Sequence, residues 1–258
     1  MLIPDTTAAI AAYLPHNTPW QIEAHDCLDS TNTACKARAA QGAPAGLVIL
    51  ADRQTAGRGR MTRSFFSPPG CGLYMSMLLR PALAAADALL LTTAAAVAAA
   101  EAIAAVTGYE PGIKWVNDLF LDDRKVCGIL TESSLAPEGR LAWAVVGIGV
   151  NVRAPEGGFP PELSHIAGAL LPADAPDTRP RLAAEILARC GAYFARLPEP
   201  AHLDEYRRRS ILIGRAVILS NTGERVTVEG IDDACRLLVR DESGHRRAVS
   251  TGECSVCL

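Results

Sequence analysis

Three arginines stand within six positions of one short run, at Arg58, Arg60 and Arg63. Guanidinium groups stay charged at any working pH and bind phosphate or carboxylate through paired hydrogen bonds. Gly57 and Gly59 let backbone N–H groups come close to such an anion. The run is not a Walker A loop, because no Gly-Lys pair follows, and a threonine replaces the third glycine of a dinucleotide fingerprint. It therefore predicts a loop that surrounds an anionic ligand by another route.

A second group of candidate residues is split between two neighbouring segments. Lys114, Asn117 and Asp118 bring a cation, a carboxamide and a carboxylate to a strand end, although alone this segment also fits a hairpin turn with an exposed lysine. Lys125 enters an apolar strand, where a buried charge is costly unless an anion pairs with it. Gly128 marks a place where a ligand or another backbone approaches closely.

Two further segments carry residue types suited to ligand binding. Gly147 and Gly149 interrupt an apolar strand that ends in Asn151, whose side chain both donates and accepts hydrogen bonds. The cluster 29–32 (Asp-Ser-Thr-Asn) consists of residues that favour the N-cap of a helix. Each of these segments is a weak signal when taken alone.

Turn residues and apolar periodicity divide the chain into the elements that must position these groups. Before residue 29 we expect one helix, over 7–14. Further helices are predicted from the 29–32 cap to about Gly42, over 82–107 with Gly108 as the stop, over 181–197, and on to about Arg209. Strands are predicted at 46–52, 71–79, 112–116, 119–121, 125–132 and 141–152.

The character of the sequence changes after Ile213. Short β-rich runs at 216–219, 225–231, 236–239 and 246–249 alternate with turns, which indicates a small barrel or sandwich. We therefore predict two domains, a catalytic one over 1–209 and a small β-barrel over 210–258. The arginine triplet at 207–209 is expected to be a solvated helix end near this boundary.

Composition excludes several classes of protein. With 258 residues, 49% hydrophobic and 21% charged, the chain is typical of a soluble globular protein. A net charge of −3 argues against a protein whose surface is built to bind nucleic acid. No secretory signal or membrane-spanning run is visible, so the eight cysteines are expected to be reduced thiols in the cytoplasm. Cys254 and Cys257 have CxxC spacing, but nothing completes a zinc site, and no protein-held metal is expected.

Taken together and in this order, the segments resemble the biotin protein ligases. The resemblance is dense from about residue 25 to 155 and implies an α+β fold: a mixed sheet with flanking helices, as in class II synthetases, plus a small C-terminal SH3-like β-barrel. The segments that carry it are Asp29–Asn32, Gln54–Arg60, Ser67–Ser76, Lys114–Asp118, Arg124–Leu130 and Gly147–Asn151.

The family resemblance implies a two-step reaction. The carboxylate of biotin attacks the α-phosphate of ATP, which gives biotinyl-5′-adenylate and pyrophosphate, with Mg²⁺ arriving with ATP. A specific lysine of a biotin carboxyl carrier protein domain, from acetyl-CoA carboxylase or a related carboxylase, then attacks this mixed anhydride. A homodimer is plausible through exposed strand edges, whereas no nucleic-acid or membrane partner is expected.

The same resemblance assigns roles to individual residues. Lys125 would serve at the biotin carboxylate and the α-phosphate, and Arg60 would retain the adenylate; these two are the expected catalytic residues. The residues expected to bind biotin are Ser30, Thr31, Asn32, Gln54, Arg58, Gly128 and Gly147. The residues expected to bind the nucleotide, beside Arg60, are Arg63, Phe65, Lys114, Asn117, Asp118 and Asn151.

The sequence departs from the family pattern in two places. Val116 stands where the family usually has proline in the Lys-Trp-Pro-Asn-Asp segment, which removes a backbone restriction but no ligand. The 28 residues before Asp29 have room for about one helix, whereas a DNA-binding helix-turn-helix needs at least two. Three alternatives stay open: a lipoate or octanoate ligase of the same superfamily, a biotin-sensing regulator, and a catalytically silent protein that works through its C-terminal barrel.

Overall fold

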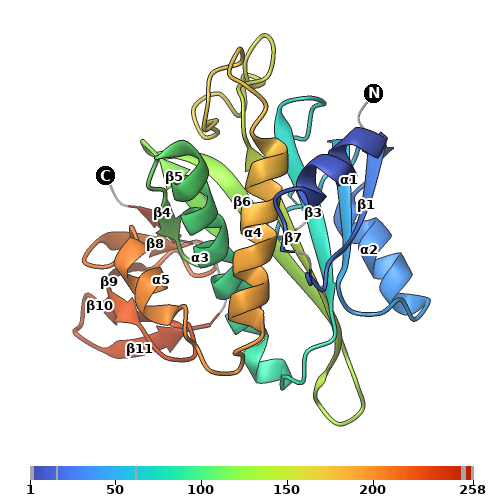
Figure 1. The fold of residues 1–258 in the computed structure, drawn as a ribbon. Helices are drawn as coiled ribbons and strands as arrows, with labels where there is room; N and C mark the ends of the chain where they lie inside the picture. Colours follow the sequence, from blue (N-terminus) through green and yellow to red (C-terminus); the bar gives the residue numbers. More distant parts are fainter. Residues whose placement is uncertain (1–2, 16, 62, 251–253, 257–258) are drawn as a thin grey trace.

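The computed structural model describes residues 3–15, 17–61, 63–250 and 254–256, and its main feature is a seven-stranded mixed sheet (Figure 1). In space the strands follow the order β1-β2-β3-β7-β6-β5-β4. β1 is parallel to β2, and every other neighbouring pair is antiparallel. The bounds are Gln21–Leu28 (β1), Leu47–Gln54 (β2), Gly72–Leu79 (β3), Gly112–Lys114 (β4), Asp118–Leu121 (β5), Arg124–Leu135 (β6) and Leu141–Asn151 (β7).

The sheet separates two helical layers. α1 (Ile3–Ala11), α3 (Ala88–Thr107) and α4 (Arg179–Phe194) cover one face, and α2 (Thr31–Ala40) covers the other (Figure 1). Side chains alternate along a strand, so Val48 and Leu50 of β2 join the core under α3 and α4, whereas Leu47 and Ile49 pack against α2. The predicted mixed sheet with flanking helices is confirmed.

α3 is apolar around its whole circumference because it is buried on nearly all sides, with residues 94–100 fully buried. The helix begins at residue 88 rather than at 82, after a 3₁₀ turn over Ala85–Asp87, and ends before Gly108, which adopts a left-handed φ of 78°. Within the described residues, Ala85–Thr107 is the one helical segment long and apolar enough to cross a membrane, but 72% of its apolar window is buried. Other parts of the protein therefore cover most of this apolar segment.

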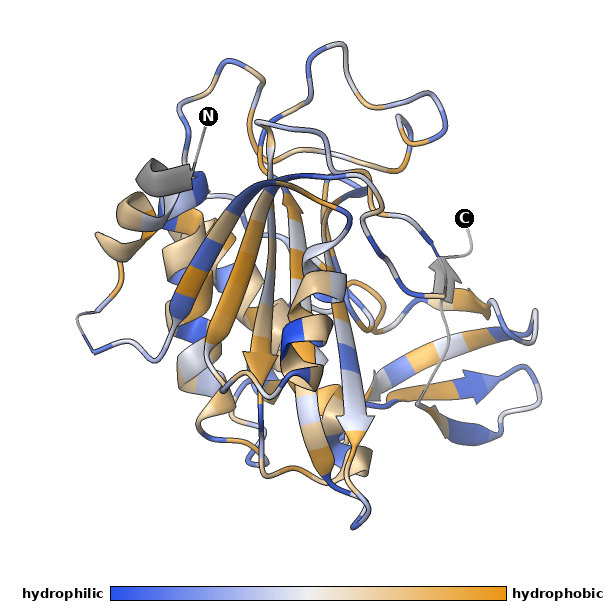
Figure 2. Ribbon diagram, turned by 90° about the vertical axis from the view of Figure 1, so that its right-hand side faces the viewer, coloured by the Kyte–Doolittle hydropathy of each residue, from blue (hydrophilic) through white to orange (hydrophobic). Residues whose placement is uncertain are grey.

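A second, five-stranded antiparallel sheet follows α5 (Leu203–Arg209), and it confirms the β-rich unit predicted after Ile213. Its strand order is β11-β10-β9-β8-β12. Buried and exposed positions alternate, as Val226 and Val228 of β9 show, and the strands carry alternating apolar and polar bands in Figure 2. The bounds are Ala216–Leu219 (β8), Arg225–Ile231 (β9), Leu237–Asp241 (β10), Arg246–Val249 (β11) and Cys254–Val256 (β12).

β1 corrects the prediction that residues 1–28 hold a helix alone. The strand lies at an edge of the sheet and pairs only with β2. Its residues include Glu23, His25 and Asp26, and most of its positions are partly or fully exposed. Because an edge strand needs little apolar surface, the alternation that identifies a strand from sequence is weak here.

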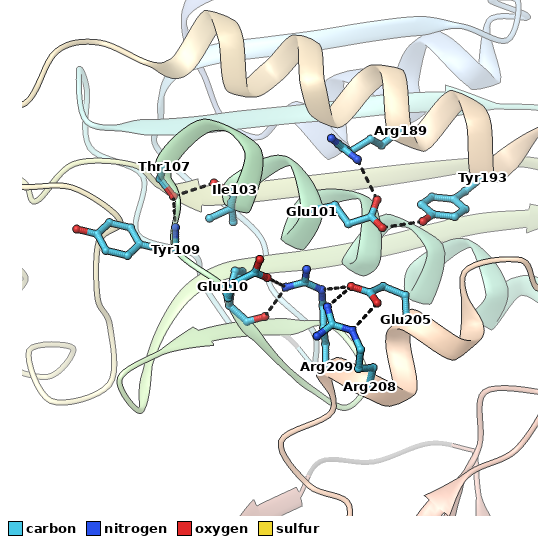
Figure 3. A network of polar contacts seen from close by, with 11 residues as sticks. Glu101, Ile103, Thr107, Tyr109, Glu110, Arg189, Tyr193, Glu205, Arg208 and Arg209 are labelled. Atoms are coloured by element: carbon cyan, nitrogen blue, oxygen red, sulfur yellow. Dashed lines mark hydrogen bonds and ion pairs between the residues drawn. The ribbon is translucent and has the colours of Figure 1, made fainter.

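The prediction of a solvated helix end at 207–209 is wrong for one of the three arginines. The side chain of Arg209 is only 7% exposed and forms ion pairs with Glu205 at 2.6 Å and Glu110 at 2.5 Å (Figure 3). Arg208, by contrast, is 63% exposed. α5 packs against β4, so one side of its last turn faces protein rather than solvent.

Most of the described cysteines match the expectation of buried, reduced thiols. Six have described side chains, and all six are free. Cys27, on the edge strand β1, is exposed, whereas the other five are buried. The side chains of Cys254 and Cys257 lie outside the described part of the structure.

A small polar cluster is buried where α3, α5 and the C-terminal sheet meet. Nε2 of His202 lies 2.8 Å from Oγ1 of Thr93, which lies 3.2 Å from Sγ of Cys235. Burial raises the pKa of the Cys235 thiol and lowers the pKa of His202 to about 4. Both side chains are therefore neutral near pH 7, which suits an interior without a counter-charge.

This cluster predicts a stability that falls on mild acidification. The unfolded chain protonates His202 near its ordinary pKa of 6.5, whereas the folded protein resists protonation down to about pH 4. The free energy of unfolding should therefore fall by about 2 kcal/mol between pH 7 and pH 5. Urea unfolding at several pH values measures this, and His202→Gln should flatten the dependence. His165→Gln, at an exposed histidine, is the control; an unchanged slope in His202→Gln would contradict the prediction.

Candidate active site

An open cavity of about 450 Å³, measured with the solvent at its mouth, lies on the side of the large sheet that α2 covers. The first turn of α2 and the end of β2 contribute Ser30, Thr31, Asn32 and Gln54 to its lining. The arginine loop contributes Arg58, Arg60 and Phe65. The central strands and the turn before β5 contribute Asn117, Lys125, Gly128 and Gly147. The fold thus brings together residues that are far apart in sequence and were predicted to share one site.

Glycines form the floor of the cavity because larger side chains approach them from above. A Cβ added to Gly147 would lie 1.9 Å from Oδ1 of Asn32, and one added to Gly149 would lie 2.7 Å from the ring of Phe65. Gly149 pairs across the sheet with Gly128. These positions need glycine so that α2 and the aromatic ring can sit directly on the sheet.

A bulge in β6 determines where Lys125 points. Leu119 pairs with Cys127, but Phe120 pairs with Lys125, so β6 advances by two residues while β5 advances by one. Such a bulge reverses the facing of the residues beyond it. Lys125 therefore shares a face with Gly128, and a Cβ on Gly128 would lie 3.2 Å from Nζ of Lys125. The glycine leaves room for the lysine to fold over the strand.

The turn between β4 and β5, together with the first residue of β5, holds both expected catalytic cations. Oδ1 of Asn117 accepts a hydrogen bond from Nη1 of Arg60 at 3.1 Å, and Nδ2 of Asn117 donates to the carbonyl of Ile129 at 2.9 Å. Oδ1 of Asp118 lies 2.6 Å from Nζ of Lys125. Both partners of this ion pair are roughly a quarter exposed, at 28% and 24%, so an incoming anion can reach the lysine.

A neutral polar network lies across the sheet from these cations. Ser30 caps α2 by accepting from the backbone N–H of Thr33 at 3.4 Å. The N–H of Thr31 donates to Oε1 of Gln54 at 2.8 Å. Oγ of Ser76, on β3, lies 2.8 Å from the hydroxyl of Thr31 and 2.6 Å from Oδ1 of Asn32. The start of α2 is therefore fixed to both β2 and β3.

Glu132 is a site residue to which sequence reasoning gave no role. Its carboxylate accepts from Nζ of Lys36 at 2.6 Å, from Nη2 of Arg58 at 3.0 Å and from Nδ2 of Asn32 at 3.0 Å. Burial opposes ionisation, but these hydrogen bonds and the charges of Lys36 and Arg58 lower the pKa of Glu132 overall. The carboxylate therefore links the arginine loop to α2.

The available signals for the missed residues were weak ones. Ser76 ends one of the segments that carry the family resemblance, and it is a fully buried polar residue inside an apolar strand, a position that indicates a polar partner without identifying it. Glu132 follows a run of apolar residues on β6, where an acidic residue suggests a partner but does not say which one.

The arginine loop folds back on itself as a narrow hairpin. The N–H of Gly59 donates to the carbonyl of Arg63 at 2.7 Å, and the N–H of Phe65 donates to the carbonyl of Gly57 at 2.8 Å. The threonine at position 62 lies outside the described residues. These bonds place Phe65 at the foot of the loop, where its ring meets Tyr74 edge-on with centroids 6.3 Å apart.

Four predicted residues do not line the cavity. Asp118 does not line the cavity itself, but it pairs with Lys125, which does. Nδ2 of Asn151 donates to the carbonyl of Gly168 at 2.9 Å, in a segment that also pairs with the backbone of Lys125. Nζ of Lys114 lies 5.4 Å from the ring centre of Phe120, and Arg63 lies on the exposed loop. The ligand-binding roles of all the predicted residues stay predictions.

No group of three His, Cys, Asp or Glu side chains within the described residues is placed to hold a metal ion. Asp118 is a carboxylate next to the cavity, and it is already paired with Lys125. The chemistry that the arrangement supports best is the binding of an anion between fixed cations, beside a neutral polar surface.

Comparison with known proteins gives two family matches. The biotin/lipoate A/B protein ligase family matches residues 24–151, which include the whole cavity lining. The biotin protein ligase C terminal domain matches residues 212–256, which include the small sheet.

Individual relatives extend over different parts of the chain. The biotin–[acetyl-CoA-carboxylase] ligase of Mycobacterium tuberculosis is 35% identical over 237 residues, which cover 87% of this chain and 84% of the relative. The bifunctional ligase/repressor BirA of Bacillus subtilis is 42% identical over 146 residues, which cover 57% of this chain and 45% of that protein. The match thus spans about half the length of the bifunctional relative.

A solved structure supports the same grouping. The biotin protein ligase from Aquifex aeolicus in complex with biotin and ATP superposes with a TM-score of 0.75 and 25% identity, over 92% of this chain and 98% of that chain. With two family matches and a relative that aligns along most of both chains, this chain belongs to the biotin protein ligase family.

Proposed function

We propose that the chain is an ATP-dependent biotin–protein ligase. A carboxylate oxygen of biotin would attack the α-phosphorus of ATP, and the bond to the bridging oxygen of the β-phosphate would break, releasing pyrophosphate. The amine of a carrier lysine would then attack the acyl carbon of the adenylate and release AMP. Family membership supports this proposal, as does the structure of the Aquifex aeolicus biotin protein ligase, which was solved in complex with biotin and ATP.

The observation that best supports the proposal is that two adjacent residues, Asn117 and Asp118, fix the side chains of Arg60 and Lys125. Asn117 and Asp118 hold the two cations on one side of a cavity whose other side carries the neutral network of Thr31 and Gln54. A ligand with a neutral polar ring and an anionic reacting group fits this division. In a site with an effective dielectric constant of about 20, two unit charges about 4 Å apart interact by roughly 4 kcal/mol. Fixed cations of this kind reduce the repulsion between a carboxylate and a triphosphate.

We assign the neutral side of the cavity to the ring of biotin. Ser30, Thr31, Asn32 and Gln54 supply donors and acceptors, and Gly147 lies beneath Asn32 in the same lining. Arg58 and Gly128 border the same space. In this arrangement the acyl chain of biotin runs across the sheet towards Lys125.

We assign the cationic side to the nucleotide. Arg60, Phe65 and Asn117 line this part, and Asp118 orients Lys125. Arg63, Lys114 and Asn151 remain proposed nucleotide-binding residues, although they lie outside the present lining. Mg²⁺ would enter with ATP and screen the charge of its phosphates.

The remaining assignments concern partners, organisation and location. The protein partner would be a biotin carboxyl carrier domain of acetyl-CoA carboxylase or a related carboxylase, because the Mycobacterium tuberculosis relative is a biotin–[acetyl-CoA-carboxylase] ligase. We propose that residues 1–209 form the catalytic domain and residues 210–258 the small β domain. A homodimer through the edge strands and a location in the cytoplasm are further parts of the proposal.

The acid that drives pyrophosphate release identifies the activity. The purified protein is incubated with ATP, Mg²⁺ and either biotin or lipoate, and pyrophosphate is measured. We expect release with biotin and only background release with lipoate. Release driven by lipoate alone would assign the protein to the lipoate branch of the superfamily, and release with neither acid would contradict an activating enzyme.

Replacing Lys125 should impair the first step. Lys125→Ala removes the ammonium group at the reacting phosphate, so biotin-dependent pyrophosphate release should fall by roughly 10²–10³-fold, the usual effect of losing one charge-stabilising donor. Arg196→Ala, at an exposed cation just beyond the C-terminal end of α4 that pairs with Glu199, serves as the control. Near-normal release from Lys125→Ala would remove the lysine from the catalytic step.

A further inference from the structure

Two buried hydrogen bonds tie the active-site turn to distant parts of the chain. The hydroxyl of Tyr206, in α5, donates to the carbonyl of Val116 at 3.0 Å across 90 positions of sequence. Nε1 of Trp115 donates to the carbonyl of Cys235, between β9 and β10, at 2.9 Å across 120 positions. Neither Tyr206 nor Trp115 lines the cavity, so neither bond belongs to the binding surface already described.

Burial makes the bond from Tyr206 a strong constraint on the turn. Tyr206 is fully buried and Val116 is 3% exposed, so no bulk water replaces the hydroxyl if it is removed. A buried carbonyl that loses its partner is left unsatisfied, which is costly because water cannot replace the lost hydrogen bond. The aromatic ring alone would fill the same space, so the hydroxyl adds a positional constraint that packing does not provide.

The constrained carbonyl lies next to the residues that hold the cations. Asn117, the next residue along the chain, accepts from Arg60, and Asp118 pairs with Lys125. The backbone carbonyl of Asn117 also accepts from the N–H of Ile129 at 2.9 Å. A shift of the backbone at Val116 therefore moves both partners of the cations relative to β6.

The hydroxyl is also suited to this role because it stays uncharged. Burial raises the pKa of Tyr206 well above its usual range, so the side chain remains a neutral donor at any working pH. It holds the turn without competing for the charges of Arg60 and Lys125.

We propose that Tyr206 is a positioning residue for adenylate formation, acting through the carbonyl of Val116 on Asn117 and Asp118. The bond from Trp115 to Cys235 fixes the same turn to the C-terminal sheet, so that this sheet supports the catalytic geometry. The inference rests on the proposed ligase function and assigns that function a residue outside the cavity.

A matched pair of tyrosine substitutions tests the role. Tyr206→Phe removes the bond to Val116 and keeps the ring. Tyr193→Phe removes a partly buried bond, from the Tyr193 hydroxyl to Oε1 of Glu101 at 3.0 Å, between α4 and α3 and away from the turn (Figure 3). Both variants lose one tyrosine hydroxyl that bonds within the protein, so Tyr193→Phe controls for the loss of such a hydroxyl elsewhere in the same domain.

Two measurements distinguish a positioning role of Tyr206 from a general loss of stability of the protein. In Tyr206→Phe we expect kcat for biotin-dependent pyrophosphate release to fall about tenfold, equivalent to about 1.4 kcal/mol, with KM for biotin changed less than twofold. The amide of Ile129 should also exchange with deuterium faster, because its acceptor, Asn117, is less well held. Tyr193→Phe should show neither change.

Two results would overturn the proposal: equal turnover and equal Ile129 exchange in the two variants, or a rise in KM for biotin as large as the fall in kcat. A wild-type protein that released no pyrophosphate with any acid would instead remove the ligase function. The hydrogen exchange of Ile129 would still test whether the bond from Tyr206 to Val116 holds the turn, because that measurement needs no substrate.

Discussion

The geometry of the cavity depends on one turn that binds two cations. Asn117 accepts from Arg60 at 3.1 Å, and Asp118 pairs with Lys125 at 2.6 Å. Such a half-buried ion pair adds little net stability, because desolvation offsets much of the attraction. The ion pair instead fixes the orientation of the Lys125 side chain, which it keeps over the glycine floor and pointing towards the space where an anion would bind. The arginine loop, which is otherwise a surface hairpin, gains a fixed position from the same turn.

The rest of the catalytic domain supplies surfaces that converge on this turn. α2 can lie directly on the sheet because Gly147 leaves room for Asn32, and its first turn is then bonded to β2 and β3. The bulge opposite Leu119 and Phe120 places Lys125 on the same face. On the opposite side, α3 and α4 bury the apolar face of the sheet. The site is therefore rigid where strands and helix meet, and its arginine loop is attached to that frame through Glu132 and Asn117.

Local chemistry in the sequence was sufficient for much of the fold. The N-cap at Ser30, the left-handed Gly108 and the turn at Asp122 and Asp123, both with positive φ, produce the predicted boundaries. The edge strand β1 was missed because its residues are too polar to show a strand pattern. The cavity lining was largely foreseen through the family resemblance rather than through the residues alone.

Long-range contacts were beyond what the sequence could indicate. The reversed facing of Lys125 arises from a pairing shift with β5, which no local pattern encodes. The roles of Glu132 and Tyr206 come from partners far away in the chain, Arg58 and Val116. Arg209 likewise looked solvated because its partner Glu110 lies far away in sequence, in the connection between α3 and β4. In each case the residue type was visible but its partner was not.

The most direct test of the account follows the oxygen atoms of biotin. The protein is supplied with ATP, Mg²⁺ and biotin whose carboxylate carries oxygen-18, and hydroxylamine takes the acyl group from the adenylate. If the carboxylate attacks the α-phosphorus in this cavity, the AMP formed carries a single oxygen-18 atom, which mass spectrometry detects. Unlabelled AMP, or label found in inorganic phosphate, would contradict the proposal that these two cations bring a carboxylate and the α-phosphate together.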